Sequence, residues 1–165
     1  MTDAKGLYDV DFVAWTEQQA EALRATAHGG ANQPLDWENL AEEIESLGKS
    51  DRRELRSQMY RIIRHLAKLQ FSQDPRGGWR ESVRDGRKQA ELVLADSPSL
   101  KPQLDQFVSE ENPGAIKRAV ADLGEFGEVD TVAQRALRQT RYTVDQVLSD
   151  WFPPEPGGSA RGEEP

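Results

Sequence analysis

The chain of 165 residues has a formal net charge of −8 and no cysteine, which excludes disulfides, thiolate chemistry and zinc sites with sulfur ligands. No stretch approaches the roughly 20 apolar residues of a transmembrane helix, and the start lacks a secretory signal, so we expect a cytoplasmic protein without a membrane partner. The length suits a single domain, which we expect over residues 1–152.

Basic and acidic side chains occupy different parts of the chain. Residues 1–48 carry two basic and ten acidic side chains, residues 49–88 carry twelve and five, and residues 89–165 carry seven and fourteen. The basic middle is suited to phosphate groups, but a free nucleic-acid binder is usually basic overall. We therefore expect the acidic parts to neutralise the middle, and we predict no tight nucleic-acid binding.

Helical spacing of apolar residues begins near the amino terminus, and no segment alternates as a strand does. The spacing predicts a first helix over residues 11–27, with Phe12 and Trp15 on its apolar face. A second helix is expected to begin after the N-cap Asp36 and to end at Gly48, which is placed to adopt the left-handed C′ conformation. Its expected buried stripe consists of Trp37, Leu40, Ile44 and Leu47.

The next two helices carry clear apolar stripes. The first of them is predicted over residues 50–72, and a turn at residues 74–78 follows it. The second begins near Trp79 and stops at Ser97 and Pro98. The first stripe contains Leu55, Met59, Ile62, Ile63, Leu66 and Leu69, and the second contains Trp79, Val83, Ala90 and Leu94.

The last third predicts shorter helices. A segment starts near Ser99, and Asn112 with Pro113 is interpreted as the cap and first residue of a separate helix that ends at Gly124 to Gly127. Residues 130–139 are expected to be helical, and Thr143 with Gln146 resembles the capping box of a short last helix. The chain is therefore predicted to be all-α, a single bundle of about five to eight helices without a sheet, followed by a disordered tail over residues 153–165.

Several stretches in one order resemble a known bacterial family. They are YDVDFVAWTEQQAEALR, LDWENLAEEIESLGKSDRRELRSQM, RHLAKLQ, WRESVRDGRKQAELVLADSPSL and TVDQVLSDWFPPE. Together they are similar to the domain of unknown function family 29. The resemblance implies an all-helical bundle and brings no established activity. The chain departs from the family pattern at Leu69, where the family usually has Trp, and at the Asn112-Pro113-Gly114 interruption.

One cluster of candidate binding residues depends on the predicted helix pair. A short connection at Gly48 would make the second and third helices antiparallel. One flank of each helix would then face the same side, and residues equally distant from the turn would meet. The resulting polar seam consists of Asp36, Asn39, Gln58, Arg61 and His65.

Two interpretations of this seam are open. In the first, it is a structural ladder of hydrogen bonds, because polar groups at the edge of a core need partners whether or not they bind anything. In the second, it is a small pocket for a ligand or cation. No catalytic residue can be assigned, and the Glu-x-x-His motif of di-metal bundles is absent, so we expect no metal and no cofactor.

The sequence favours a protein-interaction or regulatory module that binds a protein partner or a second copy of itself. It favours an enzyme less, because no nucleophile or phosphate-binding loop stands out. The alternatives are a small-ligand-binding protein or enzyme that uses the polar seam, and a weak RNA binder that uses the basic middle.

Overall fold

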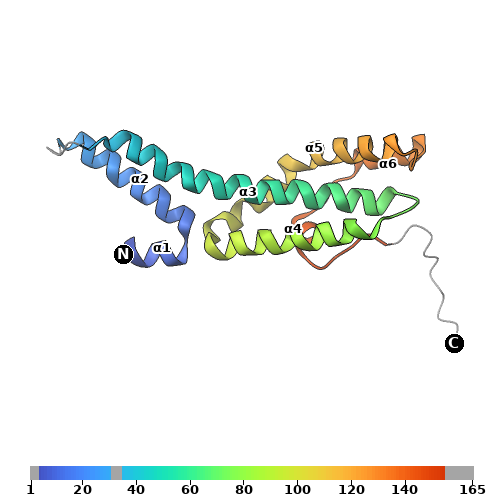
Figure 1. Ribbon diagram of the computed structural model, residues 1–165, viewed down its shortest axis with the longest axis horizontal. Coiled ribbons are helices and arrows are strands. Elements are labelled where there is room, and N and C mark those ends of the chain that lie inside the picture. Colours follow the sequence, from blue (N-terminus) through green and yellow to red (C-terminus); the bar gives the residue numbers. More distant parts are fainter. Residues whose placement is uncertain (1–3, 31–34, 155–165) are drawn as a thin grey trace, which may run out of the picture. The chain divides into compact units, whose positions relative to one another are not determined.

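The computed structural model describes residues 4–30 and 35–154, and all their regular secondary structure is helical (Figure 1). No strand occurs within these ranges, which confirms the all-α fold. Seven α-helices and one 3-10 helix, η1, follow one another there. Their bounds are α1 Ala4–Val10, α2 Phe12–His28, α3 Trp37–Phe71, α4 Gly77–Asp96, η1 Pro98–Gln103, α5 Leu104–Glu125, α6 Thr131–Gln139 and α7 Val144–Leu148.

Tertiary contacts divide the described residues into two compact units. The first unit contains the described residues up to Ser57 together with Gln89–Leu104. The second contains Gln58–Lys88 together with the described residues from Asp105 onward. Helices α3 and α4 each contribute residues to both units. The single domain expected over residues 1–152 stays a prediction.

Helix α3 runs without a break from Trp37 to Phe71, so the predicted end of a helix at Gly48 is wrong. Gly48 is buried, and a Cβ atom added to it would overlap the Thr16 hydroxyl of α2. Thr16 is fully buried as well, and its hydroxyl donates to the Val13 carbonyl oxygen over 2.7 Å. The glycine therefore serves the close approach of α2 and α3 in the first unit.

Replacing Gly48 with alanine is expected to destabilise the protein by about 1–3 kcal/mol, the usual cost of overpacking. At an open helical position alanine stabilises by roughly 0.5–1 kcal/mol relative to glycine, so the expected sign is reversed here. Urea unfolding of Gly124→Ala provides the matched control, because nothing lies within 4 Å of its Cβ position in α5. Adding Thr16→Ala should restore part of the loss, and an unchanged stability of Gly48→Ala would contradict the close contact.

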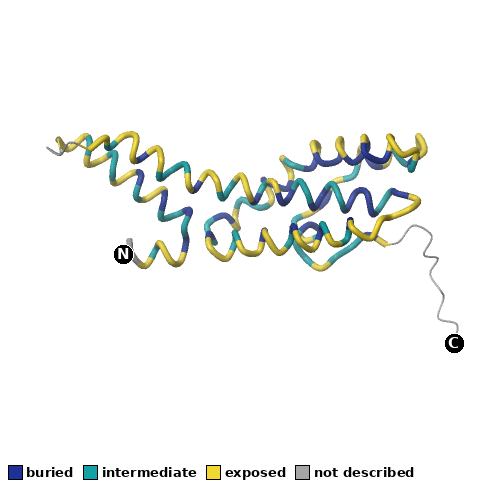
Figure 2. Tube along the Cα trace, in the orientation of Figure 1, coloured by how far each residue is buried: buried dark blue, intermediate teal, exposed yellow. Residues whose placement is uncertain are grey.

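The apolar stripe predicted over residues 50–72 is confirmed along α3 (Figure 2). On α4, Trp79, Val83 and Ala90 are buried, as their spacing predicts, whereas Leu94 of the same stripe is only half-buried. A Cβ atom on Gly86 would lie 2.8 Å from Ile62 Cγ1, so α3 and α4 approach closely in the second unit. The buried residues of this stretch are Leu55, Met59, Ile62, Ile63, Leu66 and Leu69.

The predicted core of the first unit is wrong at several positions. Phe12 and Trp15 are only half-buried and form an aromatic cluster with Tyr8, whose ring centroid lies 5.9 Å from that of Phe12 and 4.9 Å from that of Trp15. Tyr8 belongs to α1, a helix that the apolar spacing did not predict. Leu40 is 42% exposed. The residues of α2 that are buried are Val13, Thr16 and Ala20.

Helix α5 continues through Pro113, so the predicted start of a separate helix at Asn112 is wrong. The Asn112 side chain is buried and contacts the backbone of Tyr142. Its Nδ2 donates to the Tyr142 carbonyl oxygen over 3.1 Å and to that of Val108 over 2.9 Å, and its Oδ1 accepts from the Tyr142 N–H over 3.1 Å. The amide therefore joins two distant segments of the second unit.

Helix α4 begins at Gly77, within the turn predicted over residues 74–78, whereas the helix boundaries after residue 120 follow the predictions. The chain leaves α5 through Gly127, whose φ of 64° is in the left-handed region that glycine readily adopts. Helix α6 covers the segment predicted over residues 130–139, with Asp130 as its N-cap. The capping box of Thr143 and Gln146 is present at the start of α7. Of the tail predicted over residues 153–165, residues 155–165 lie outside the described residues.

Candidate interaction surface

The five candidate binding residues do not form a seam between antiparallel helices, because α3 is one helix. Asp36 and His65 are 29 positions apart, which corresponds to about 43 Å along a helix that rises 1.5 Å per residue. The predicted hairpin is wrong, and its members fall into two groups. A ligand role for either group stays a prediction. The groups are Asp36 with Asn39 at the start of α3, and Gln58, Arg61 and His65 farther along.

Asp36 has the capping role that the sequence predicts. Its Oδ1 accepts from the backbone N–H of Asn39 over 3.2 Å, in the first turn of α3. The Asn39 side chain also donates to Asp36 Oδ2 over 2.5 Å. Both residues are exposed. The first contact satisfies one backbone N–H in the first turn of α3, and the second holds the Asp36 carboxylate in place.

His65 contacts the backbone of its own helix. Its Nδ1 lies 2.8 Å from the Arg61 carbonyl oxygen, and because that oxygen only accepts, Nδ1 carries the hydrogen. Burial lowers the pKa of the His65 ring from the ordinary value of 6.5, and the positive charges of Lys68, Arg64 and Arg61 lower it further. The hydrogen bond to Arg61 acts in the opposite direction. The folded chain therefore favours the neutral ring.

The pH dependence of stability is expected to report this preference. Between the lowered pKa of folded His65 and the ordinary pKa of the unfolded chain, the unfolded state binds more protons. The free energy of unfolding therefore carries no penalty from His65 above about pH 6.5. It decreases as the pH falls below that value, because His65 takes up a proton more readily in the unfolded chain. Urea unfolding at pH 7.5 and 5.5 should show a smaller loss for His65→Gln than for the wild type. His28→Gln, at the exposed end of α2, should keep the wild-type loss, and an equal loss in all three proteins would refute the assignment.

Within the described ranges, no three His, Asp or Glu residues are arranged to hold a metal ion. No described helix is both long enough and apolar enough to cross a membrane. The buried polar side chains of these ranges make structural contacts, as two networks in the second unit illustrate.

Three arginines of α4 contact the segment after α7. Arg80, Arg84 and Arg87 lie with their guanidinium carbons 4.8, 5.6 and 4.8 Å from the centroid of the Phe152 ring. Arg87 also donates to the carbonyl oxygens of Val147 (2.9 Å), Gln146 (3.0 Å) and Trp151 (2.6 Å). These contacts satisfy carbonyl groups at the end of α7. They give these arginines a structural role, and weak RNA binding through the basic middle stays a prediction.

A second network surrounds Asp122 of α5, a residue that no sequence motif indicates. Asp122 is 7% exposed. Its carboxylate lies 2.7 Å from Arg64 Nε, 3.1 Å from Arg118 Nε and 3.7 Å from Lys68 Nζ. Only the pair with Arg118 has a local signal in the sequence, because the two residues are four positions apart on one helix.

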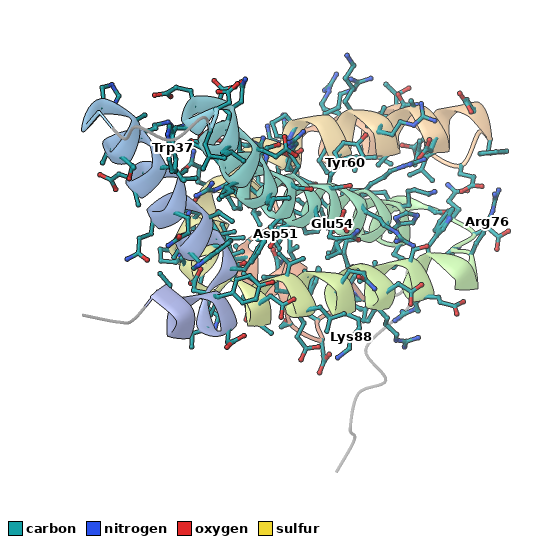
Figure 3. All side chains as sticks on the ribbon, turned by 60° about the vertical axis from the view of Figure 1, so that its left-hand side comes forward. Trp37, Asp51, Glu54, Tyr60, Arg76 and Lys88 are labelled. Carbon is teal, nitrogen blue, oxygen red and sulfur yellow. The ribbon has the colours of Figure 1, made fainter. Side chains whose placement is uncertain are left out.

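Large apolar side chains are exposed along the N-terminal half of α3, whose course Trp37, Asp51 and Glu54 mark in Figure 3. Leu40 and Leu47 are 42% and 44% exposed and lie seven positions apart, hence on one face. The half-buried Ile44 lies between them on that face. We call Leu40, Ile44 and Leu47 the α3 stripe.

The family model for the domain of unknown function DUF29 matches residues 7–152. The chain belongs to the DUF29 family. The crystal structure of an α-helical protein of unknown function from Rhodospirillum rubrum is similar, with a TM-score of 0.68 and 28% sequence identity over 87% of this chain and 89% of that one. Among curated proteins, no sequence matches. The family departure at Leu69 keeps an apolar residue in the core, since Leu69 is buried.

In this DUF29 chain the α3 stripe lies in a strongly acidic segment. Residues 35–48 contain five acidic side chains and no basic one. Glu45 is paired with Arg24 across the α2–α3 contact, at 2.8 Å. Glu43 is exposed and makes no ion pair within the described residues. The stripe thus combines exposed leucines with unneutralised negative charge.

Proposed function

We propose that this chain is a protein-interaction module that contacts its partner through the α3 stripe. The observation that carries the proposal is the exposure of Leu40 and Leu47 on one helical face. Single exposed leucines are common on protein surfaces, whereas neighbouring ones that form a patch mark contact sites. Covering the exposed half of each side chain would contribute on the order of 1 kcal/mol. Removing both leucines should therefore weaken such a contact measurably.

A ligand-binding or enzymatic function through the predicted seam has less support. Asp36 and Asn39 complete the cap of α3, and His65 Nδ1 is bonded to the Arg61 carbonyl oxygen. That alternative was argued from a hairpin at Gly48, whereas α3 is one continuous helix.

Co-purification tests the proposed function. A tagged wild-type chain is compared with the double variant Leu40→Gln/Leu47→Gln, in which glutamine keeps side-chain length and helix propensity but removes the apolar surface. Leu92→Gln is the matched control, since Leu92 of α4 is 47% exposed. Circular dichroism verifies that all three proteins fold equally.

The expected result is a partner, identified by mass spectrometry, that the wild type and Leu92→Gln retain and the double variant loses. A partner that the double variant retains equally well would contradict the role of the α3 stripe. So would the absence of any stoichiometric partner from all three preparations.

A further inference from the structure

We infer that the segment bound by the α3 stripe is a basic amphipathic helix of another protein. The inference rests on the proposed function and adds the chemistry of the partner. It depends on what covers the equivalent face of α3 in the second unit, on where that cover ends, and on the charge beside the exposed leucines.

The α3 stripe has a counterpart on the same helix. Residues 18 positions apart differ by about five full turns, so they occupy the same angular position. Ile44 therefore corresponds to Ile62 and Leu40 to Gln58. In the second unit α4 packs on this face, because a Cβ atom on Gly86 would lie 2.8 Å from Ile62 Cγ1 and 3.4 Å from Gln58 Oε1. A helix is thus the element that this face of α3 accepts.

Helix α4 ends before it reaches the level of the α3 stripe. In the first unit α4 ends at Asp96, and the next residue, Ser97, donates its hydroxyl to Asp51 Oδ2 over 3.2 Å. Residues 37–50 of α3 precede that level and span about 21 Å. Leu40 and Leu47 lie within this span and stay exposed. The length of α3 that α4 does not reach suits about four turns of a partner helix, and α2 packs on another face of this length, at Gly48.

Charge indicates which kind of helix fits. A partner on the stripe would lie beside Glu43, in a segment with five acidic and no basic residues. Basic side chains flanking an apolar face would match this charge, which raises the association rate and suppresses acidic competitors. Helix α4, which packs on α3 in the second unit, also has basic side chains beside an apolar face. Its apolar face of Trp79, Val83 and Ala90 is accompanied by Arg80, Arg84, Arg87 and Lys88.

A second copy of this chain fits the stripe less well. Pairing two α3 helices through their stripes would bring two copies of residues 35–48 together. Like charges facing each other across an interface oppose association. The same repulsion disfavours acidic helices of other proteins.

The experiment uses the full chain and two fluorescein-labelled peptides of about 18 residues with leucines at helical spacing. One peptide carries lysine at its polar positions, and the other carries glutamate there. Fluorescence anisotropy at physiological salt is expected to show binding of the lysine peptide, with the glutamate peptide weaker by about tenfold or more. Leu40→Gln/Leu47→Gln should weaken the lysine peptide by about tenfold, whereas Leu92→Gln should bind it like the wild type.

A matched pair of charge reversals separates specific docking from general attraction between opposite charges. Glu43→Lys lies beside the stripe, and Glu125→Lys makes the same charge change at the exposed end of α5. Only Glu43→Lys should weaken the lysine peptide, by roughly threefold or more. Equal effects of the two reversals, equal binding of the two peptides, or no binding of either would overturn the inference.

Two further outcomes distinguish this inference from the proposed function. A co-purifying partner that depends on Leu40 and Leu47, without a preference for the lysine peptide, would leave the proposed function standing and overturn the inference. Self-association that the double variant abolishes in analytical ultracentrifugation would assign the stripe to a second copy and would also overturn it.

Discussion

The Asp122→Ala variant is expected to lose about 3–5 kcal/mol of stability, the cost of removing one member of a buried ion pair. Its three cationic partners do not depend on it equally. The side chains of Arg64 and Arg118 are 28% and 54% exposed, so both can turn toward water. The side chain of Lys68 is 11% exposed and has little access to solvent. Most of the expected loss therefore comes from Lys68.

Lys68 is held between a carboxylate and a ring. Its Nζ lies 3.7 Å from Asp122 Oδ2 and 4.4 Å from the centroid of the Trp79 ring. Burial lowers the pKa of the Lys68 ammonium, and the Asp122 carboxylate acts in the opposite direction. Without Asp122, a buried ammonium has only the ring for support, which is costly. The double variant Asp122→Leu/Lys68→Met, which removes both charges, should therefore be more stable than Asp122→Ala.

Urea unfolding followed by circular dichroism at pH 7 measures these effects. Glu125→Ala is the matched control, because it removes an exposed carboxylate from the same helix, and its expected change is within about 0.5 kcal/mol. A loss below about 1 kcal/mol for Asp122→Ala would show that Lys68 is supported without it. A double variant less stable than Asp122→Ala would show that packing, and not the orphaned charge, dominates.

Helices of this chain were predictable where a local signal has one meaning. The stripe from Leu55 to Leu69 is apolar at helical spacing, and burying such a face needs no knowledge of the partner element. The capping box of Thr143 and Gln146 satisfies the first turn of α7 by itself. Such features are properties of single segments, so the sequence contains them completely.

Predictions failed where a residue type has two uses. Glycine ends helices, but it also permits two helices to approach, and the buried contact of Gly48 with Thr16 selects the second use. Asparagine caps helices, but the amide of Asn112 contacts Tyr142, thirty positions away. In both cases the contacting residue lies in another segment of the chain, so the local sequence pattern cannot indicate it.

The candidate sites depended even more on tertiary structure. The predicted polar seam required a turn at Gly48. Because α3 continues through Gly48, Asp36 and His65 lie far apart along one helix. The Asp122 network was missed because Arg64 lies 58 positions away. Leu40 and Leu47 were expected in the core because they are apolar, but both side chains are exposed. An exposed apolar face of this kind can be located only once the ends of the neighbouring helices are known.

The Asn112→Ala variant is expected to lose about 2–4 kcal/mol, because it leaves two buried backbone groups without partners. The N–H and the carbonyl oxygen of Tyr142 both bond to the Asn112 amide. Tyr142 is buried, and its hydroxyl donates to Gln70 Oε1 of α3 over 2.7 Å. The segment between α6 and α7 is therefore fixed to α5 by the amide and to α3 by the phenol, and the variant removes the first of these attachments.

Urea unfolding gives the stability of this variant, and the near-ultraviolet circular dichroism of Tyr142 and its neighbour Trp151, whose ring centroids are 6.2 Å apart, reports local loosening. Gln106→Ala removes an exposed amide from the same helix and should change stability by no more than about 0.5 kcal/mol. Asn112→Asp keeps the acceptor for the Tyr142 N–H but loses both donors and buries a charge. Relative to Asn112→Ala it should therefore be less stable at pH 7 and gain as acid neutralises the new carboxyl. Equal stabilities of Asn112→Ala and Gln106→Ala would mean that water replaces the amide at Tyr142, which its burial argues against.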